Sequence, residues 1–130
     1  MIIGIGTDLV KISRIEEIFD KYKERFINRM LNDKELGKLN SLTPSSRVKY
    51  LAKRFAAKEA FAKAIGTGFN KDVTLKNIAI SNDKTGKPFY DINDKLDSYI
   101  KEKLNVSEYL IHLSITDDRE YANAIAIIEK

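Results

Sequence analysis

Three cations and one carboxylate lie close together in an alanine-rich segment of the chain, RFAAKEAFAKAIGTG, at residues 54–68. Glu59 and Lys63 are four residues apart and would share one face of a helix, whereas Arg54 and Lys58 would share another. An exposed helix with one ion pair is the simplest interpretation. Two features favour a binding role instead: the charges lie within a stripe of alanines suited to close packing, and the closing Gly-Thr-Gly lets a ligand approach the backbone.

A second candidate carboxylate follows two glycines near the N-terminus, in the segment GIGTD at residues 4–8. Gly6 would interrupt a β-strand, either at a bulge that leaves Asp8 solvated or where the strand leaves the sheet and presents Asp8 to a ligand. The two glycines are not a dinucleotide-binding fingerprint, because the third glycine is absent and no helix is expected to begin in this loop.

The single histidine of the chain, His112, lies in a segment of alternating polar and apolar residues, IHLSITD, at 111–117. On a strand, this alternation places His112, Ser114 and Thr116 on one face and the three aliphatic residues on the other. A lone histidine on a polar strand face is usually structural. A row of polar groups also suits contacts to a phosphate or a base, so both interpretations stay open.

Composition restricts the chemistry that these residues can perform. The chain has 130 residues, 43% of them hydrophobic and 32% charged, which is ordinary for one soluble domain covering residues 1–130. It has no cysteine and one histidine, which excludes disulfides, thiolate nucleophiles, cysteine-bound zinc and sites built from several histidines. The N-terminus does not read as a signal peptide and no apolar run is long enough to cross a membrane, so we expect a cytoplasmic protein without membrane association.

Positive charge is concentrated in the first half of the chain. Residues 11–63 contain 14 Lys and Arg against 7 Asp and Glu, although the net charge of the whole chain is +4. The charges are interspersed with periodic apolar residues, so they lie on folded elements and not on a basic tail. This surplus predicts an acidic partner: nucleic acid, an anionic membrane, an acidic protein or a phosphorylated ligand.

Local signals predict the elements that must position these residues. Ser13 and Asn32 are each followed three residues later by a glutamate, the capping-box pattern that starts a helix. Thr43-Pro44 and Gly66 would begin and end one long helix. The complete expectation is strands at 1–10, 76–82, 89–92, 109–116 and 121–129, with helices at 13–22, from 32, at 43–65 and at 93–104. This pattern indicates a mixed α+β domain with an antiparallel sheet, whose last two strands form a hairpin.

The motifs occur in an order and at separations that resemble one known family. They are Gly6-Thr7-Asp8 with Arg14, the signature F-x-x-K-E-A-x-x-K-A-x-G-x-G from Phe55 to Gly68, Gly86-Lys87-Pro88, and His112-Leu-Ser114-Ile-Thr116. Together they resemble the holo-acyl-carrier-protein synthases, the small single-domain 4′-phosphopantetheinyl transferases, over nearly the whole chain. The resemblance implies that family's fold, a compact domain in which an antiparallel sheet packs against a long helix. Asp117 stands where many members carry another histidine, so no role remains for a second imidazole.

The resemblance also implies a reaction. The phosphopantetheine arm of coenzyme A moves to a serine of apo-acyl carrier protein, adenosine 3′,5′-bisphosphate is released, and the product serves fatty acid biosynthesis. A homotrimer with sites between its subunits is implied as well. Phosphoryl transfer depends mainly on positioning and on the stabilisation of charge, which a metal ion and cationic side chains provide.

The same resemblance suggests roles for individual residues. Asp8 and Glu59 would bind Mg²⁺ together with the pyrophosphate of coenzyme A. Glu59, or a metal-bound water beside it, would accept the proton of the acceptor serine, and Lys63 would stabilise the leaving group. The expected contacts to coenzyme A are Lys58, Lys63, Gly66 and His112. The expected dock for the acidic carrier protein is the basic surface on and just after the first helix, with Arg14, Lys21 and Arg25.

Three alternatives remain open. A broader-scope transferase for the carrier domains of larger synthases would have the same fold, although such relatives are tandem repeats of this unit and therefore much longer. A nucleic-acid-binding module would fit the pI of 9.2 and the six tyrosines, but no helix-turn-helix, RNA-recognition or zinc pattern is present. A structural trimer without activity would release no adenosine 3′,5′-bisphosphate.

Overall fold

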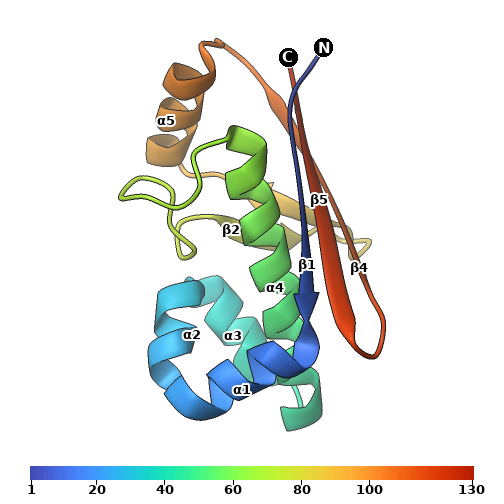
Figure 1. Cartoon of the computed structure of the whole chain (residues 1–130). Coiled ribbons are helices and arrows are strands. Elements are labelled where there is room, and N and C mark those ends of the chain that lie inside the picture. The colour runs from blue at the N-terminus through green and yellow to red at the C-terminus, as the bar shows by residue number, and fades with distance from the viewer.

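Strands from the two ends of the chain form the larger of two antiparallel sheets. In the computed structural model, which describes residues 1–130, this sheet has the strand order β1–β5–β4, and a separate hairpin pairs β2 with β3. The elements in chain order are β1 (Ile2–Lys11), α1 (Ile12–Tyr22), α2 (Glu24–Met30), α3 (Asp33–Ser41), α4 (Pro44–Ile65), β2 (Ala79–Asn82), β3 (Pro88–Asp91), α5 (Asp94–Leu104), β4 (Leu110–Asp117) and β5 (Tyr121–Glu129). The two termini meet at one end of the larger sheet, where the Lys130 amide donates to the Met1 carbonyl (Figure 1).

Helix α4 crosses one face of the larger sheet and forms the centre of the core (Figure 1). The alanine stripe expected from the sequence, Ala52, Ala56, Ala60 and Ala64, is buried. Strand β1 can approach the helix closely because Gly6 has no side chain: a carbon atom added there would overlap the Ala60 carbonyl oxygen. This close contact fixes the separation of helix and sheet, and it places residues of β1 directly beside residues of α4.

Side-chain caps and a left-handed glycine define the ends of the helices. Asn32 accepts a hydrogen bond from the Glu35 amide at 2.9 Å, and the Glu35 carboxylate accepts one from the Asn32 amide at 3.2 Å, which confirms the predicted capping box of α3. Asn93 caps α5 through the Leu96 amide at 2.9 Å. At the end of α4, Gly66 adopts a φ of 81°, a conformation that glycine tolerates without steric cost.

The start of the first helix differs from the sequence-based expectation. Ser13 does not cap it, because β1 runs directly into α1, which begins at Ile12. The Ile12 amide donates instead to the Glu120 carbonyl at 2.8 Å, so the turn between β4 and β5 supplies the partner that a side-chain cap would supply. Helix α2 had no local signal and was not expected. The strand expected at 76–82 begins only at Ala79, because the residues before it form a side-chain-capped turn.

The face of the larger sheet that points away from α4 carries exposed aliphatic side chains. Ile5 and Leu9 of β1 are 62% and 64% exposed, and they alternate with the inward-facing Gly6 and Val10. No other element covers this face (Figure 1). None of the five helices is both long and apolar enough to span a lipid bilayer.

Candidate active site

Asp8 is held on β1 beside α4. It pairs with Ala124 of β5 and the strand continues to Lys11, so the expectation that the strand leaves the sheet at Asp8 is wrong. The Asp8 side chain is 15% exposed. The Lys63 ammonium donates to Asp8 Oδ1 at 3.0 Å and to the Thr7 carbonyl at 3.0 Å. The sheet therefore fixes the carboxylate, and a cation from α4 is paired with it.

Glu59 lies one helical turn before Lys63 and joins the same cluster. Burial is the main cause of a raised pKa of Glu59, and the nearby negative charge of Asp8 raises it further. The cations Lys63 and Arg14 act in the opposite direction, so they also lie near the Glu59 carboxyl. We call Asp8, Glu59 and Lys63 the carboxylate cluster. It forms where β1 and α4 meet, with Arg14 at the start of α1 beside it.

The two carboxylates fit a divalent cation that takes its other ligands from a substrate. The negative charges of Asp8 and Glu59 repel each other, and this repulsion contributes to the raised pKa of Glu59. A bound cation would offset the repulsion. No group of three or more acidic, histidine or cysteine side chains is arranged to hold a metal ion. Two carboxylates alone suit Mg²⁺, which usually binds one or two protein carboxylates together with substrate phosphates and water.

Lys58 does not belong to this site, and the expectation that it contacts coenzyme A is wrong. Its side chain is 0% exposed. The ammonium donates to the Met30 carbonyl at 2.5 Å and to Glu35 Oε1 at 2.7 Å, so both contacts are within the core. Burial lowers the pKa of Lys58 to about 8, and the charge of Glu35 opposes that effect. Lys58 joins α4 to the end of α2 and the start of α3, and no ligand can reach it.

Arg54 is buried in the same region, one helical turn before Lys58. Its Nη2 donates to Asn82 Oδ1 at 2.7 Å, and its Nε lies 3.7 Å from Glu35 Oε2. The guanidinium also covers the Tyr50 ring, with 4.7 Å between the guanidinium carbon and the ring centroid. Residues of α3, α4 and β2 therefore hold this one cation in place.

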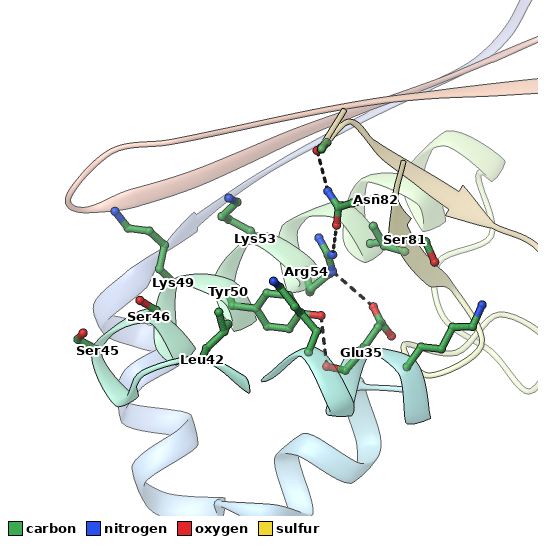
Figure 2. A pocket seen from close by; sticks show the side chains of 14 residues that line it. Glu35, Leu42, Ser45, Ser46, Lys49, Tyr50, Lys53, Arg54, Ser81 and Asn82 are labelled. Atoms are coloured by element: carbon green, nitrogen blue, oxygen red, sulfur yellow. Dashed lines mark hydrogen bonds and ion pairs between the residues drawn. The ribbon is translucent and has the colours of Figure 1, made fainter. Parts of the chain in front are cut away.

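A basic cleft of about 820 Å³ opens above Arg54 (Figure 2). The buried Arg54 and Glu35 form its floor, and Asn82 and the Gly86 of the predicted turn also line it. Four lysines line it: Lys34, Lys38, Lys49 and Lys53. We call this feature the basic cleft. Arg54, Gly86 and the surplus of cations in residues 11–63 are its signals in the sequence, but none of the four lysines belongs to a motif.

Asp117 and Asp91 are acidic residues that pair with lysines of the basic cleft, Asp91 at 3.7 Å from the Lys34 ammonium. Asp117 pairs with two of these lysines. Its two carboxylate oxygens lie 3.3 Å from the Lys49 ammonium and 3.7 Å from the Lys53 ammonium. These side chains are partly exposed, so the pairs contribute little to stability. Asp117 joins the end of β4 to the first half of α4.

The basic cleft and the carboxylate cluster lie on different sides of α4. Tyr50 lines the cleft, and Glu59 follows it after nine residues, about two and a half helical turns. The two side chains therefore project in roughly opposite directions from the helix axis. One copy of the chain does not present both features to the same small ligand.

Of the other expected contacts to coenzyme A, Lys63 belongs to the carboxylate cluster, whereas His112 does not. His112 lies on β4, on the sheet face that points away from α4, where its Nε2 is 2.9 Å from Glu129 Oε1. Gly66 lies at the C-terminal end of α4, with open space where a side chain would stand. Their roles stay predictions.

The basic residues of α1 and α2 are at the surface. Arg14, Lys21 and Arg25 are all exposed. Arg14 and Lys21 are seven residues apart on α1 and project from nearly the same side of it. Arg14 is the one beside the carboxylate cluster, since its charge acts on Glu59.

Comparison with known proteins shows the family. Residues 4–126 match the model of the 4′-phosphopantetheinyl transferase superfamily, and the chain belongs to this superfamily. A holo-[acyl-carrier-protein] synthase of Wolbachia pipientis is 46% identical, with 98% of this chain and 98% of the relative covered. A second one, of Geobacillus, is 45% identical over 100% of this chain and 98% of the relative.

Solved structures agree with the sequence comparison. The crystal structure of holo-[acyl-carrier-protein] synthase from Neisseria meningitidis matches this chain with a TM-score of 0.89 and 40% sequence identity, over 100% of both chains. The enzyme from Bacillus anthracis, solved in complex with CoA (3′,5′-ADP), has a TM-score of 0.81 and 36% identity over 98% of this chain and 96% of that one. The fold expected from the sequence, an antiparallel sheet packed against a long helix, is confirmed.

Proposed function

We propose that this protein transfers the 4′-phosphopantetheine arm of coenzyme A to a serine of apo-acyl carrier protein and releases adenosine 3′,5′-bisphosphate. The observation that carries the proposal is the carboxylate cluster, in which Asp8, Glu59 and Lys63 converge from β1 and α4. Relatives named for this activity match the chain over nearly its full length. The acceptor would be the carrier protein of fatty acid biosynthesis in the cytoplasm.

The reaction breaks a phosphoanhydride bond of coenzyme A and forms a phosphodiester with the acceptor serine. The serine oxygen forms a bond to the phosphorus that carries the pantetheine arm, and the bond from that phosphorus to the bridging pyrophosphate oxygen breaks. Glu59, or a water beside it, takes the serine proton. Lys63 stabilises the negative charge that develops on the departing phosphate.

Asp8 and Glu59 would hold Mg²⁺ in this reaction. When bound, the ion would offset the charge of the pyrophosphate oxygens. Lys63 keeps Asp8 oriented through a 3.0 Å ion pair before any ion is present. Both carboxylates sit on regular secondary structure, so little reorganisation is needed to receive the ion.

The basic cleft would bind the adenosine end of coenzyme A, and the two regions would meet between copies of the chain. The cleft has four lysines and an arginine, a charge that suits the phosphates of a nucleotide. It lies on the opposite side of α4 from the carboxylate cluster, so a shared site requires the cleft of one copy and the cluster of another. The exposed Ile5 and Leu9 on the sheet face offer an apolar surface for this assembly. The homotrimer itself comes from the family resemblance.

The acidic carrier protein would dock on the basic surface of α1 and α2. Arg14 lies between that surface and Glu59, so it is the cation best placed to guide an acidic helix towards the carboxylate cluster. Lys21 and Arg25 extend the same exposed surface.

The experiment that tests the function is a mass measurement. Purified protein is incubated with apo-acyl carrier protein, coenzyme A and Mg²⁺, and the carrier protein is expected to gain one phosphopantetheine group while adenosine 3′,5′-bisphosphate appears. Carrier domains from larger synthases, assayed in parallel, distinguish the broader-scope transferase. If the carrier protein keeps its apo mass, the proposed function is wrong.

A further inference from the structure

The two oxygens of the buried Glu35 carboxylate have different surroundings. The Glu35 side chain is 1% exposed. Oε1 accepts hydrogen bonds from the Lys58 ammonium at 2.7 Å and from the Asn32 amide at 3.2 Å, and these bonds account for the capping of α3 and for the neutralisation of Lys58. Oε2 has no hydrogen-bond partner and faces Arg54 Nε at 3.7 Å. Helix capping and the pairing of Lys58 therefore explain only one of its two oxygens.

Arg54 has hydrogen-bond donors that the fold does not use. A guanidinium carries five N–H groups. One is bonded to Asn82, and Nε is buried without a partner. The ring of Tyr50 lies against one face of the group, and Glu35 and Asn82 lie at its edge (Figure 2). The remaining N–H groups of Arg54 are therefore held in place in the floor of the basic cleft.

The negative charge of Glu35 also stabilises the buried Arg54 guanidinium. The Arg54 side chain is 6% exposed, and the four lysines of the cleft add positive charge around it. A buried cation among other cations is unfavourable unless a negative charge compensates it. Glu35 is the only carboxylate paired with Arg54. Without this charge, the guanidinium would be repelled from the floor of the cleft.

We propose that Glu35 is a positioning residue for nucleotide recognition: it holds the Arg54 guanidinium in the floor of the basic cleft, where the free N–H groups bind the 3′-phosphate of coenzyme A. This inference rests on the proposed function. A planar guanidinium with several free donors is suited to a phosphate monoester, which offers several oxygens to a fixed donor array. The 3′-phosphate is the group assigned, because the pyrophosphate would react at the carboxylate cluster and the 3′-phosphate is the other phosphate group of coenzyme A.

The test compares coenzyme A with 3′-dephospho-coenzyme A as substrates. Glu35→Gln keeps the shape of the side chain and an oxygen for Lys58 and Asn32, but it removes the charge beside Arg54. We expect the KM for coenzyme A to rise about tenfold, as for the loss of one charge-assisted hydrogen bond, with kcat within about twofold. The KM for 3′-dephospho-coenzyme A should stay unchanged, because the phosphate that Arg54 binds is absent from it. Asp33→Asn, an exposed carboxylate in the first turn of the same helix, is the matched control and should affect neither substrate.

A double-mutant cycle separates positioning from simple stabilisation of the fold. If Glu35 acts through Arg54, then Glu35→Gln should cause no further change in either KM once Arg54→Gln is present. Glu35→Asp keeps the charge but withdraws it from Arg54, and it should raise the KM for coenzyme A selectively even if Glu35→Gln folds poorly. Equal loss of activity on both substrates, or an effect of Glu35→Gln that persists without Arg54, would overturn the proposal.

A binding measurement keeps this inference separate from the proposed function. Titration calorimetry with adenosine 3′,5′-bisphosphate and with adenosine 5′-monophosphate needs no transfer reaction. The wild-type protein should prefer the bisphosphate, and Glu35→Gln should lose that preference. If wild type transfers the arm normally and Glu35→Gln retains the preference, only the role of Glu35 fails. If wild type transfers no arm, the proposed function fails first.

Discussion

At the scale of single residues, Glu59 has the environment that most directly affects chemistry. Burial and the charge of Asp8 raise its pKa, and Lys63 and Arg14 limit that rise. The negative charge of Asp8 therefore disfavours ionisation of Glu59, and the positive charges of Lys63 and Arg14 favour it. Removing the negative neighbour should lower the pKa of Glu59, and removing a positive neighbour should raise it.

The first prediction concerns this titration in the metal-free protein. Asp8→Asn should lower the pKa of Glu59, because it removes a negative charge that disfavours ionisation. Arg14→Gln should raise it, because it removes a cation that favours ionisation. The measurement is the carboxyl ¹³C shift of Glu59 as a function of pH, with Lys21→Gln as the control for loss of a distant cation from the same helix. Shifts of the same sign for Asp8→Asn and Arg14→Gln would contradict the arrangement.

The second prediction concerns activity and folding together. Asp8→Ala and Glu59→Ala should each lower transfer by about a hundredfold or more, since each removes charge stabilisation from the reacting phosphate. The fold should survive, because each substitution also removes half of a repelling carboxylate pair.

Both properties can be measured on the same samples. Transfer is followed with Mg²⁺ saturating, and thermal unfolding is recorded without metal. The raised pKa of Glu59 also sets the sign of the pH effect: its contribution to stability is present below its unfolded pKa and is lost as the pH rises through the folded pKa. Wild-type turnover in either variant would remove the carboxylate cluster from the mechanism.

At the scale of elements, the contact between β1 and α4 positions the carboxylate cluster. β1 brings Asp8 and α4 brings Glu59 and Lys63, and the distance between the two elements is set by Gly6 against the Ala60 carbonyl. A larger residue in the strand would separate the elements and so separate the charges that they carry.

The third prediction follows from this contact. Gly6→Ala should destabilise the protein by about 3 kcal/mol, because the new methyl group overlaps backbone atoms that cannot move independently. Gly37→Ala is the matched control: the position is exposed on α3 with nothing near it, and the change should stabilise the helix by about 0.5–1 kcal/mol. Chemical denaturation measures both. Equal stabilities of the two variants would show that β1 and α4 are not in close contact at Gly6.

The fourth prediction concerns α1 as the dock for the carrier protein. Arg14→Glu should lower kcat/KM for carrier protein by about thirtyfold, on the order of 2 kcal/mol, because it reverses an attraction at the entrance to the carboxylate cluster. The wild-type rate at low carrier-protein concentration should fall as salt rises, and the rate of the variant should fall less. A raised KM for coenzyme A with unchanged use of the carrier protein would place the dock elsewhere.

At the scale of the whole molecule, the basic cleft is separated from the carboxylate cluster, so the proposed site for coenzyme A would need two copies of the chain. Each feature is complete within one chain, yet they face different sides of α4. The exposed aliphatic residues of the sheet would be buried by such an assembly. Activity should therefore depend on oligomerisation and not only on folding.

The fifth prediction tests this dependence in two ways. Leu9→Asp should shift the protein from trimer to monomer in light scattering and abolish transfer, because it places a charge in an apolar interface. Glu59→Ala and Arg54→Gln, each impaired alone, should recover part of the wild-type activity when their subunits are mixed and exchanged. A stable and fully active monomer, or no recovery on mixing, would show that the site lies within one chain.

The features that the sequence determined by itself are those that depend on neighbouring residues. The caps at Asn32 and Asn93, the end of α4 at Gly66 and the alternation along β4 were predicted, since each depends on bonds or angles within a few positions of the chain. The charges of α4 were recognised in the same way. Their spacing on one helix could show which of them share a face, but not what that face meets.

The packing of the elements determines which of those charges are available to a ligand. Lys58 and Glu59 are adjacent in the sequence, but Lys58 is buried against Met30 and Glu35, and Glu59 is partly exposed beside Asp8. These partners are more than twenty positions away, and burial depends on how the elements pack. The start of α1 at Ile12 differs from the expectation for the same reason, because its first amide is satisfied from the opposite end of the chain. The basic cleft likewise exists only because α3, α4 and β2 bring their side chains together.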